Sequence, residues 1–353
     1  MTTAAGLTAA VTTAAGLMVI MNRTVAGTIR AVTRPFRFGL HLWELPVDGW
    51  RDRVRRYEEL GFSTVTMTDH VVVPQWEPIA GLSAVAAVTD RLRVGPLVLD
   101  MGLRDPVLVA KAAATVDRLS AGRLELGVGA GYVAANFGAA GQPFEPAADR
   151  VSRLEEAVEL MRQLWANPST TFRGRFYDVT DSPMAASAPV RPHLLVGGGG
   201  RRVMRFAGRV ADTVSMIARQ TSGEWSVADS LADSTVDRMA EKAAWIREGA
   251  VAAGRDPSSV ELHTMVARVV VGDDPGEAVR QAMTDDGVDT KAAEGSTLYL
   301  CGTADQVRER LQQWRAEAGI TYVSLFDPGD DQIEWLAEQV VRPLAEEDAA
   351  AGG

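Results

Sequence analysis

The stretch Arg123-Leu-Glu-Leu-Gly-Val-Gly-Ala-Gly131 reads as a hydrophobic strand that ends in glycines. Two other predicted strands are likewise followed by short polar or glycine-rich segments. Thr64–Thr68 is followed by Asp69-His70, and His193–Val196 is followed by Gly197–Gly200. Recurrent alternation of strands and helices indicates a parallel sheet with crossover helices. Because ligands bind at the carboxyl ends of the strands in such folds, we expect these segments to share one site.

The same alternation continues along the chain and predicts the fold class. Eight strand–helix units in about 310 residues fit an expanded (β/α)8 TIM barrel, an α/β fold. A two-domain dinucleotide-binding enzyme is the rival, but its glycines would lie in the first strand–helix turn. The predicted strands are 36–42, 64–68, 92–99, 123–128, 194–196, 212–217, 261–271 and 320–326. The predicted helices are 48–60, 79–89, 105–119, 149–165, 201–208, 236–253, 304–318 and 332–344, with a side hairpin at 172–179 and a loop at 218–234.

Local composition sets the expected domain boundaries. Residues 1–34 begin with an uncharged run rich in Ala, Thr and Gly, which lacks the basic segment of a signal peptide, so we expect a disordered extension. Met21 is a candidate start, which would place residues 1–20 outside the native protein. Residues 35–345 are expected to form a single domain, and residues 346–353 a frayed tail.

Charge, cysteine and histidine content exclude several functional classes. The formal net charge of −10 disfavours non-specific nucleic-acid binding. The single cysteine, Cys301, excludes an internal disulfide and fits a reducing, cytoplasmic location. The four histidines have no metal-ligand spacing, and no segment is a convincing membrane span. We therefore expect a small-molecule partner, with no metal, membrane or nucleic acid.

Two glycine-rich segments are candidates for binding a cofactor. Gly197-Gly198-Gly199-Gly200 precedes Arg201 at the start of a basic helix, which predicts phosphate binding by backbone N–H groups and the helix N-terminus. The alternative is a flexible turn before a solvated helix. Gly129-Ala130-Gly131 would let a flat ring or a ribityl chain pass close to the backbone. The alternative there is that the glycines only relieve crowding between strands.

Asp69-His70 is the candidate catalytic pair, because a histidine at this edge can exchange protons near neutral pH. The alternative is a histidine whose hydrogen bonds are satisfied by the backbone. His41 ends the first strand on the same edge and is, with Trp76 and Tyr132, a weaker candidate for contact with substrate. His193 lies at the opposite end of its strand and is expected to be structural.

These segments, in this order and spacing, resemble the bacterial luciferase-like superfamily of flavin- and deazaflavin-dependent oxidoreductases. Within it, the chain is most similar to the actinobacterial group that uses coenzyme F420, a deazaflavin. The matching stretches are Gly61 to His70, Arg91 to Gly95, Val98-Leu99, Arg104 to Pro106, Ala112 to Arg123, Leu126 to Gly131, Arg150 to Glu156 and Leu195 to Arg202.

The resemblance implies a (β/α)8 barrel with an insertion after strand six or seven, usually assembled as a homodimer. It implies that the cofactor ring stacks on a backbone bulge at strand three, where a non-prolyl cis peptide aligns with Leu97-Val98. His70 matches the family's proton-handling histidine, and Trp76 lies near, but not at, the spacing of its partner tryptophan. The aligned cofactor positions are Asp69, His70, Leu97, Val98, Gly129, Ala130, Gly131, Gly198 and Gly199.

The implied activity is hydride transfer between C5 of the deazaflavin and a small organic substrate, by reduction of C=C or C=N bonds or by alcohol oxidation. His70 would be the acid/base, with Asp69 a second candidate. Sugar-phosphate dehydrogenases of this group carry a glutamate where this chain has Tyr132, so sugar-phosphate oxidation is not expected. Relatives often carry an amide where this chain has Asp100. The alternative is an FMN-dependent monooxygenase fed by a separate flavin reductase, and a third hypothesis is a barrel that has lost its cofactor.

Overall fold

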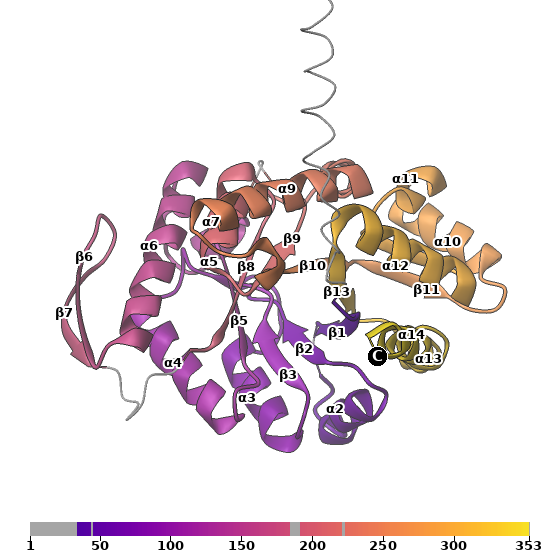
Figure 1. Ribbon diagram of the computed structural model, residues 1–353, viewed down its shortest axis with the longest axis horizontal. Coiled ribbons are helices and arrows are strands. Elements are labelled where there is room, and N and C mark those ends of the chain that lie inside the picture. Colours follow the sequence, from indigo (N-terminus) through magenta and orange to yellow (C-terminus); the bar gives the residue numbers. More distant parts are fainter. Residues whose placement is uncertain (1–33, 44, 184–190, 221–222, 353) are drawn as a thin grey trace, which may run out of the picture. The chain divides into compact units, whose positions relative to one another are not determined.

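The computed structural model describes residues 34–43, 45–183, 191–220 and 223–352 (Figure 1). The extension predicted at residues 1–34 lies outside these ranges, except for Arg34. From Pro35 onward the described chain forms one unit. None of its helices is long and apolar enough to cross a bilayer.

Within the described residues, the main sheet contains nine strands in the order β3-β2-β1-β13-β10-β9-β8-β5-β4, with parallel pairing throughout. β3 and β4 are two parts of one strand position, and a parallel bridge between Val94 and Leu124 closes the ring. The (β/α)8 barrel prediction is confirmed, and Figure 1 shows the strands surrounded by helices. The strands are β1 (Arg37–Leu42), β2 (Thr64–Met67), β3 (Arg93–Pro96), β4 (Leu99–Asp100), β5 (Glu125–Gly129), β8 (His193–Gly198), β9 (Thr213–Met216), β10 (Glu261–Val266) and β13 (Ile320–Phe326).

The helices begin at residues that satisfy their first N–H groups. In α4, the Asp105 side chain accepts hydrogen bonds from Val107 and Leu108, and Pro106 occupies the first turn. α12 begins with a capping box at Thr303.

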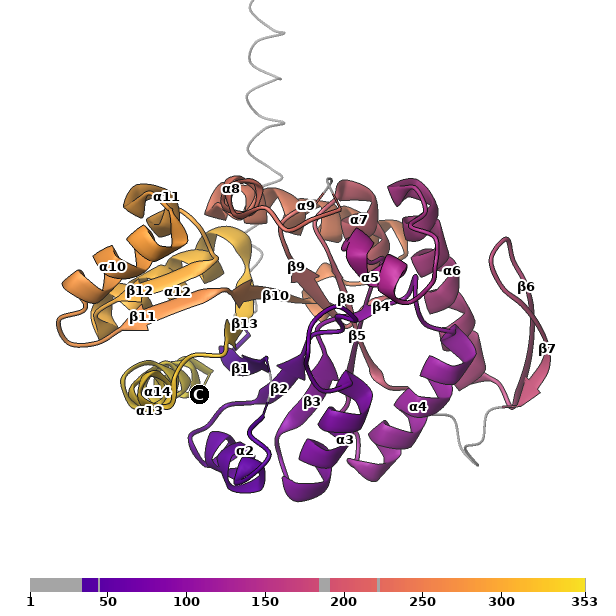
Figure 2. The ribbon, with the colours of Figure 1, turned by 180° about the vertical axis from the view of Figure 1, so that it is seen from behind.

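Figure 2 shows the helices from the opposite side. They are α2 (Trp50–Glu59), α3 (Pro78–Val88), α4 (Pro106–Leu119), α5 (Ala134–Ala139), α6 (Ala147–Ala166), α7 (Arg201–Val210), α8 (Val227–Ala232), α9 (Val236–Ala252), α10 (Gly276–Asp286), α11 (Thr290–Glu294), α12 (Ala304–Ala318), α13 (Asp330–Leu336) and α14 (Arg342–Gly352), with a 3-10 turn at Pro257–Ser259 and a π-helical turn at Ala337–Val341.

The seventh predicted strand, 261–271, is divided between two sheets. Its first part is β10 of the barrel, whereas β11 (Arg268–Val271) pairs in parallel with β12 (Tyr299–Gly302), a strand that was not predicted. The N–H of Ala267 donates to the carbonyl of Leu298, so the chain leaves the barrel at this point. With α10 and α11 these strands form an insertion after the seventh barrel strand. The predicted side hairpin is present as the antiparallel pair β6 (Ser169–Arg173) and β7 (Asp178–Pro183).

The chain end is helical where a frayed tail was expected from residue 346. α13 continues through the π-helical turn into α14, which extends to residue 352. Asp348 accepts a hydrogen bond from the backbone N–H of Phe36 at 2.7 Å and pairs with Arg315 at 2.5 Å. These contacts with residues far away in the chain are not visible in the local composition, which explains the difference.

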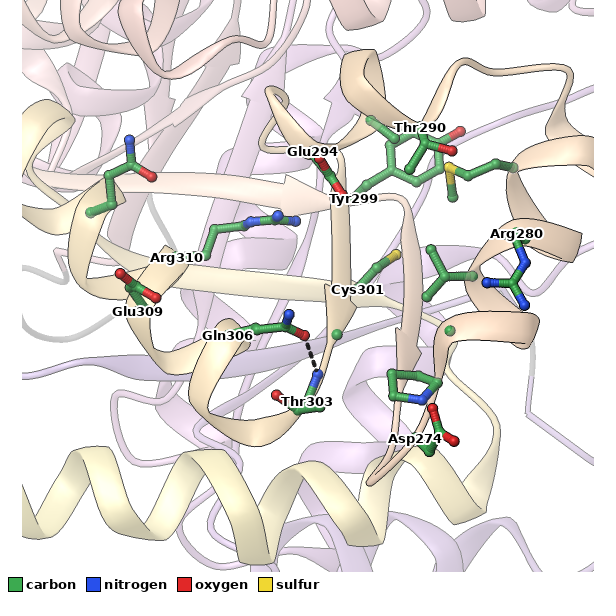
Figure 3. A pocket seen from close by; sticks show the side chains of 17 residues that line it. Asp274, Arg280, Thr290, Glu294, Tyr299, Cys301, Thr303, Gln306, Glu309 and Arg310 are labelled. Atoms are coloured by element: carbon green, nitrogen blue, oxygen red, sulfur yellow. Dashed lines mark hydrogen bonds between the residues drawn. The ribbon is translucent and has the colours of Figure 1, made fainter.

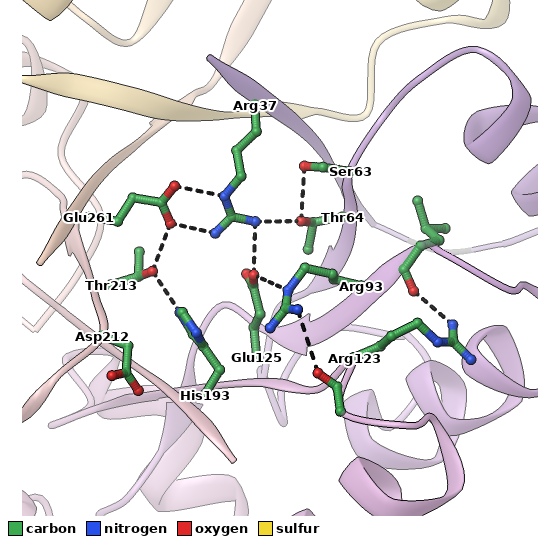
Figure 4. Close-up of polar contacts among 12 residues, drawn as sticks. Arg37, Ser63, Thr64, Arg93, Arg123, Glu125, His193, Asp212, Thr213 and Glu261 are labelled. Carbon is green, nitrogen blue, oxygen red and sulfur yellow. Dashed lines mark hydrogen bonds and ion pairs between the residues drawn. The ribbon is translucent and has the colours of Figure 1, made fainter. Parts of the chain in front are cut away.

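A cluster of buried and partly buried ionisable side chains lies at the amino-terminal end of the barrel (Figure 4). Arg37 donates two hydrogen bonds to Glu261, at 2.8 and 2.6 Å, and its guanidinium lies 2.8 Å from Glu125. Nε2 of His193 lies 2.8 Å from Oγ1 of Thr213 in the same cluster, which agrees with the structural role expected for this histidine. The name amino-end cluster is used below for Arg37, Arg93, Glu125, His193 and Glu261.

Candidate active site

The segments expected to form the site meet at the carboxyl edge of the barrel. His41 lies near the end of β1, Asp69-His70 follows β2, and Leu97-Val98 separates β3 from β4. Gly129 is the last residue of β5, and Gly198 is the last residue of β8. Because these strands are parallel, their ends lie at the same edge.

The third strand position is interrupted at the Leu97–Val98 peptide bond, which is cis, as the resemblance implies. Leu97 and Val98 are partly exposed, whereas Leu99 is buried. A Cβ atom placed on Gly129 would lie 2.6 Å from Cγ2 of Val98, and one on Gly197 would lie 3.0 Å from Cγ1. Both glycines therefore make room for the Val98 side chain, and the Leu97-Val98 segment stays partly accessible.

Asp69 is held in an ion pair. Its carboxylate accepts hydrogen bonds from Arg104 at 2.6 and 2.7 Å and from the backbone N–H of Asp100 at 2.9 Å. The side chain is only 9% exposed. This geometry makes Asp69 a link between the end of β2 and β4, and leaves it poorly placed to exchange protons with a substrate.

His70 has a hydrogen-bond partner on one ring nitrogen. Its Nδ1 lies 2.9 Å from Nδ2 of Asn136, and its ring meets the Tyr132 ring edge-on, with 6.5 Å between centroids. Nε2 has no hydrogen-bond partner within the described ranges. Burial lowers the pKa of His70, against a smaller opposing effect of Asp69. At neutral pH His70 is therefore an uncharged imidazole with one nitrogen available to a ligand.

The loop after β5 is held by Arg150 and packs against Asp100. Nε of Arg150 donates to the carbonyl of Gly131 at 3.1 Å. Gly131 has a φ of 70°, and a side chain there would overlap the Asp100 carboxylate, so the position requires glycine. Burial raises the pKa of Asp100 to about 6, and a hydrogen bond from the N–H of Gly102 opposes this effect. Ala130 is partly buried against the main core.

His41 is buried and uncharged. Its Nδ1 lies 2.8 Å from Oγ1 of Thr66, and its ring packs against Phe326 with 5.3 Å between centroids. Nε2 is buried and has no partner among the described residues. Burial lowers the pKa of His41 to about 3, and the electrostatic effect of nearby His70 adds to this. Because His41 is 0% exposed, its unpartnered nitrogen is not accessible to a substrate here, and the expected substrate contact stays a prediction.

The Trp76 ring contacts the ring of Trp50, whereas the His70 ring contacts that of Tyr132. Trp76 meets Trp50 of α2 edge-on at 6.2 Å, and a Cβ atom on Gly81 of α3 would lie 3.2 Å from the Trp76 ring. Trp76 therefore packs between α2 and α3, which gives no support to the expected substrate contact. Tyr132 supplies the aromatic ring beside His70.

The N-terminus of α7 is the open part of the Gly197–Gly200 segment. Gly200 is the N-cap residue without a side-chain cap, and a Cβ atom placed on it would meet nothing within 4 Å. A Cβ atom on Gly199, by contrast, would lie 2.5 Å from the carbonyl oxygen of Ile217. Uncapped N–H groups in a first helical turn can bind a phosphate. The Arg201 side chain pairs instead with Glu248 at 3.2 Å, so the backbone is the better candidate for this contact.

A cavity of about 670 Å³ lies between the insertion and α12 (Figure 3). Its lining includes Arg280, Glu294, Cys301 and Arg310, and none of the predicted site residues. Burial raises the pKa of Cys301 to about 11, so its thiol is a poor nucleophile at neutral pH. Cavity size alone therefore does not identify the site, and the chemistry is concentrated at the carboxyl edge.

Two residues that set the geometry of the site were not predicted as members of it. Asn136 contacts His70 across 66 positions of sequence, and Arg104 contacts Asp69 across 35. In the sequence analysis, Arg104 was named only within a stretch that resembles the family, and no role was assigned to it. Asn136 lies in the short helix α5, where no local sequence pattern indicates function.

Comparison with known proteins agrees with this architecture. A family model described as luciferase-like monooxygenase matches residues 32–322. The chain is 30% identical over 311 residues to an F420-dependent glucose-6-phosphate dehydrogenase from Intrasporangium calvum, covering 81% of this chain and 90% of that protein. It is 26% identical over 296 residues to an FMNH(2)-dependent dimethylsulfone monooxygenase from Pseudomonas fluorescens, covering 78% and 80% respectively. Among solved structures, an F420-dependent secondary alcohol dehydrogenase in complex with an F420-acetone adduct superposes with a TM-score of 0.73 at 20% identity, covering 88% of this chain and 99% of that chain.

Proposed function

The chain belongs to the luciferase-like monooxygenase family, and we propose that it is a coenzyme F420-dependent oxidoreductase that transfers a hydride between the deazaflavin and a small organic substrate. F420-dependent dehydrogenases among its sequence relatives support this cofactor. The observation that carries the proposal is the composition of the carboxyl edge. An accessible backbone bulge at Leu97-Val98, the uncharged His70 and the uncapped N-terminus of α7 all belong to that edge.

The residues of this edge fit the parts of such a cofactor. The bulge would support the flat ring, the backbone at Gly129-Ala130-Gly131 would lie along the ribityl chain, and the first N–H groups of α7 would hold the phosphate. When bound, F420 supplies C5 as the hydride donor or acceptor. His70 presents its free ring nitrogen to the substrate, and Asp69 keeps the end of β2 in place through Arg104.

The substrate is proposed to be a small uncharged carbonyl compound, imine or alcohol. Burial raises the pKa of Tyr132, so its phenol stays neutral where sugar-phosphate dehydrogenases carry a glutamate. Tyr132 and His41 are uncharged at neutral pH, and the neighbouring Asp69 carboxylate is neutralised by its ion pair with Arg104. The activity named for the glucose-6-phosphate dehydrogenases is therefore not extended to this chain.

A binding titration tests the cofactor. Quenching of the intrinsic fluorescence should show micromolar binding of F420 and much weaker binding of FMN. The reverse preference would favour the second candidate, an FMN-dependent monooxygenase with a separate flavin reductase. The similarity to the dimethylsulfone monooxygenase supports this alternative. Binding of neither cofactor would contradict both.

Gly200→Asp separates phosphate binding from folding. Gly200 has a φ of −88° and an open Cβ direction, so an aspartate there can cap α7 and should maintain or raise the melting temperature. Its negative charge would occupy the phosphate position, and we expect at least a tenfold loss of F420 affinity, or about 1.4 kcal/mol. Gly200→Ser, an uncharged cap, is the matched control and should lose much less affinity. Equal affinities for the two variants would place the phosphate elsewhere.

The protein is further proposed to act as a cytoplasmic homodimer. The free thiol of Cys301 is consistent with a reducing compartment. Leu108 on α4 is 68% exposed in the single chain, and a shallow groove between α3 and α4 surrounds it. Light scattering would test the dimer, and Leu108→Glu should shift the mass toward that of one chain if this surface is the interface.

A further inference from the structure

The side-chain amide of Asn136 has a defined orientation. Its Oδ1 accepts hydrogen bonds from two successive backbone N–H groups, those of Val71 at 3.0 Å and Val72 at 3.2 Å. The Nδ2 group then faces Nδ1 of His70 at 2.9 Å. Turning the amide over would place its NH2 group against two N–H donors and leave both without an acceptor, which is costly for a residue that is 2% exposed.

This orientation decides which nitrogen of His70 carries the proton. An amide NH2 can only donate, so Nδ1 of His70 must accept and therefore has no proton. A neutral imidazole without a proton on Nδ1 has it on Nε2, the nitrogen with no partner among the described residues. Protonation of Nδ1 would set two donors against each other, so this contact and the burial of His70 act in the same direction on its pKa.

We infer that Asn136 is a positioning residue that holds His70 as a neutral Nε2–H donor, so that the substrate group recognised here is an oxygen or nitrogen that accepts a hydrogen bond. This inference rests on the proposed function for the identity of the reaction, but the state of His70 follows from the protein alone. A carbonyl oxygen fits such a donor. As a hydride adds to the substrate carbon, the electrons of the carbonyl π bond move to this oxygen, the hydrogen bond from Nε2 stabilises the charge, and a proton from solvent completes the product. The same Nε2 cannot accept a hydroxyl proton, so His70 is a hydrogen-bond donor and not a general base.

The other ionisable groups around His70 do not reverse this assignment. Asp69, on the same loop, has its carboxylate occupied by Arg104 and the N–H of Asp100. Tyr132 faces the ring as a neutral phenol, and His41 is uncharged at neutral pH. The direct partner of Nδ1 is thus the neutral amide of Asn136.

NMR of the full chain labelled with 15N-histidine, without cofactor, tests the inference directly. The chain has four histidines, and the signals missing from His70→Ala identify His70. At neutral pH we expect an unprotonated Nδ1 and a protonated Nε2. A protonated Nδ1 in the native chain would overturn the inference, whatever the variants do.

Asn136→Asp provides the matched change, because it keeps the side-chain shape and the acceptor for Val71 and Val72. Its second oxygen can only accept from His70, so Nδ1 should become protonated and the pKa of His70 should rise by about one unit or more. Asn136→Leu removes both functions at similar volume and should leave a mixture of His70 tautomers. An unchanged His70 spectrum in Asn136→Asp would also overturn the inference.

Turnover of a cyclic enone with reduced F420 gives the functional readout. Asn136→Asp should lower kcat about 100-fold at neutral pH, similar to His70→Ala, while F420 affinity changes less than about twofold. In Asn136→Asp, kcat should instead recover as the pH falls below the raised pKa of His70, because the imidazolium again donates from Nε2. Native turnover in this variant contradicts the positioning role. If the native chain neither binds nor uses F420, the proposed function fails, and the NMR result still decides the state of His70.

Discussion

The two ends of the barrel bury ionisable side chains with opposite results. At the amino end, burial would raise the pKa of Glu125, but Arg37 and His193 outweigh it and the pKa is lowered (Figure 4). At the carboxyl edge, burial of Asp100 prevails over a hydrogen bond from Gly102 and raises the pKa to about 6. The two carboxylates are similarly inaccessible, at 2% and 5% exposed. The opposite pKa shifts of Glu125 and Asp100 therefore come from their charged and hydrogen-bonding partners, and not from a difference in burial.

The two ends also differ in whether a ligand can reach their ionisable side chains. In the amino-end cluster, Arg37 is held by two carboxylates and lies 3.6 Å over the Tyr322 ring. Buried atoms without a partner occur at both ends of the described barrel, namely Oε2 of Glu125 in the amino-end cluster and Nε2 of His41 at the carboxyl edge. His70 differs from both because its side chain is partly exposed, so a ligand can reach its Nε2.

The largest expected effect is at the amino end. Arg37→Met leaves Glu125 and Glu261 buried without their shared cation, so the free energy of unfolding should fall by about 3–5 kcal/mol. Urea unfolding measures this. Arg56→Gln is the control, since its ion pair with Glu334 is exposed and its loss should leave the midpoint unchanged. An equal loss of unfolding free energy in the two variants would show that the amino-end cluster contributes no more to stability than an exposed ion pair.

The pH dependence of stability tests the carboxyl edge next. His41 has a pKa of about 3 in the folded chain and about 6.5 when unfolded, so the unfolded chain takes up a proton first as the pH falls. Stability is therefore lost below pH about 6.5, by about 1.4 kcal/mol per pH unit for this histidine. His41→Gln should reduce the slope of unfolding free energy between pH 6 and 4.5 by about that amount. An unchanged slope would mean that the His41 ring is not kept uncharged.

Asp100 is expected to make a smaller contribution to the pH dependence of stability, with the opposite sign to that of His41. Its folded pKa of about 6 lies above the unfolded value, so its favourable contribution is complete below pH about 4 and is lost as the pH rises through 6. Asp100→Asn keeps an acceptor for Gly102 and should raise stability at pH 7 by on the order of 2 kcal/mol, with no gain at pH 4. Thermal melts at the two pH values measure this. Destabilisation at both would show that the carboxylate has a partner it needs.

Much of the fold was predictable because its causes are local. The hydrophobic periods of Arg123–Val128 and of the other barrel strands, and the glycine or polar residues that follow them, are visible in short windows of sequence. The division of 261–271 between two sheets was not, because it depends on a hydrogen bond from Ala267 to Leu298. The tail after residue 346 is likewise helical through contacts of Asp348 with Phe36 and Arg315.

For the site, the sequence by itself determined which strand ends carry glycine, histidine and carboxylate, since parallel topology brings those ends to one edge. Only the tertiary structure decided what each residue can do there. In the folded chain, Asp69 accepts hydrogen bonds from Arg104, the amide of Asn136 contacts Nδ1 of His70, and Trp76 packs against Trp50. The physical reason is that the charge and proton position of a buried side chain depend on its hydrogen-bond partners, and these partners are supplied by distant parts of the chain.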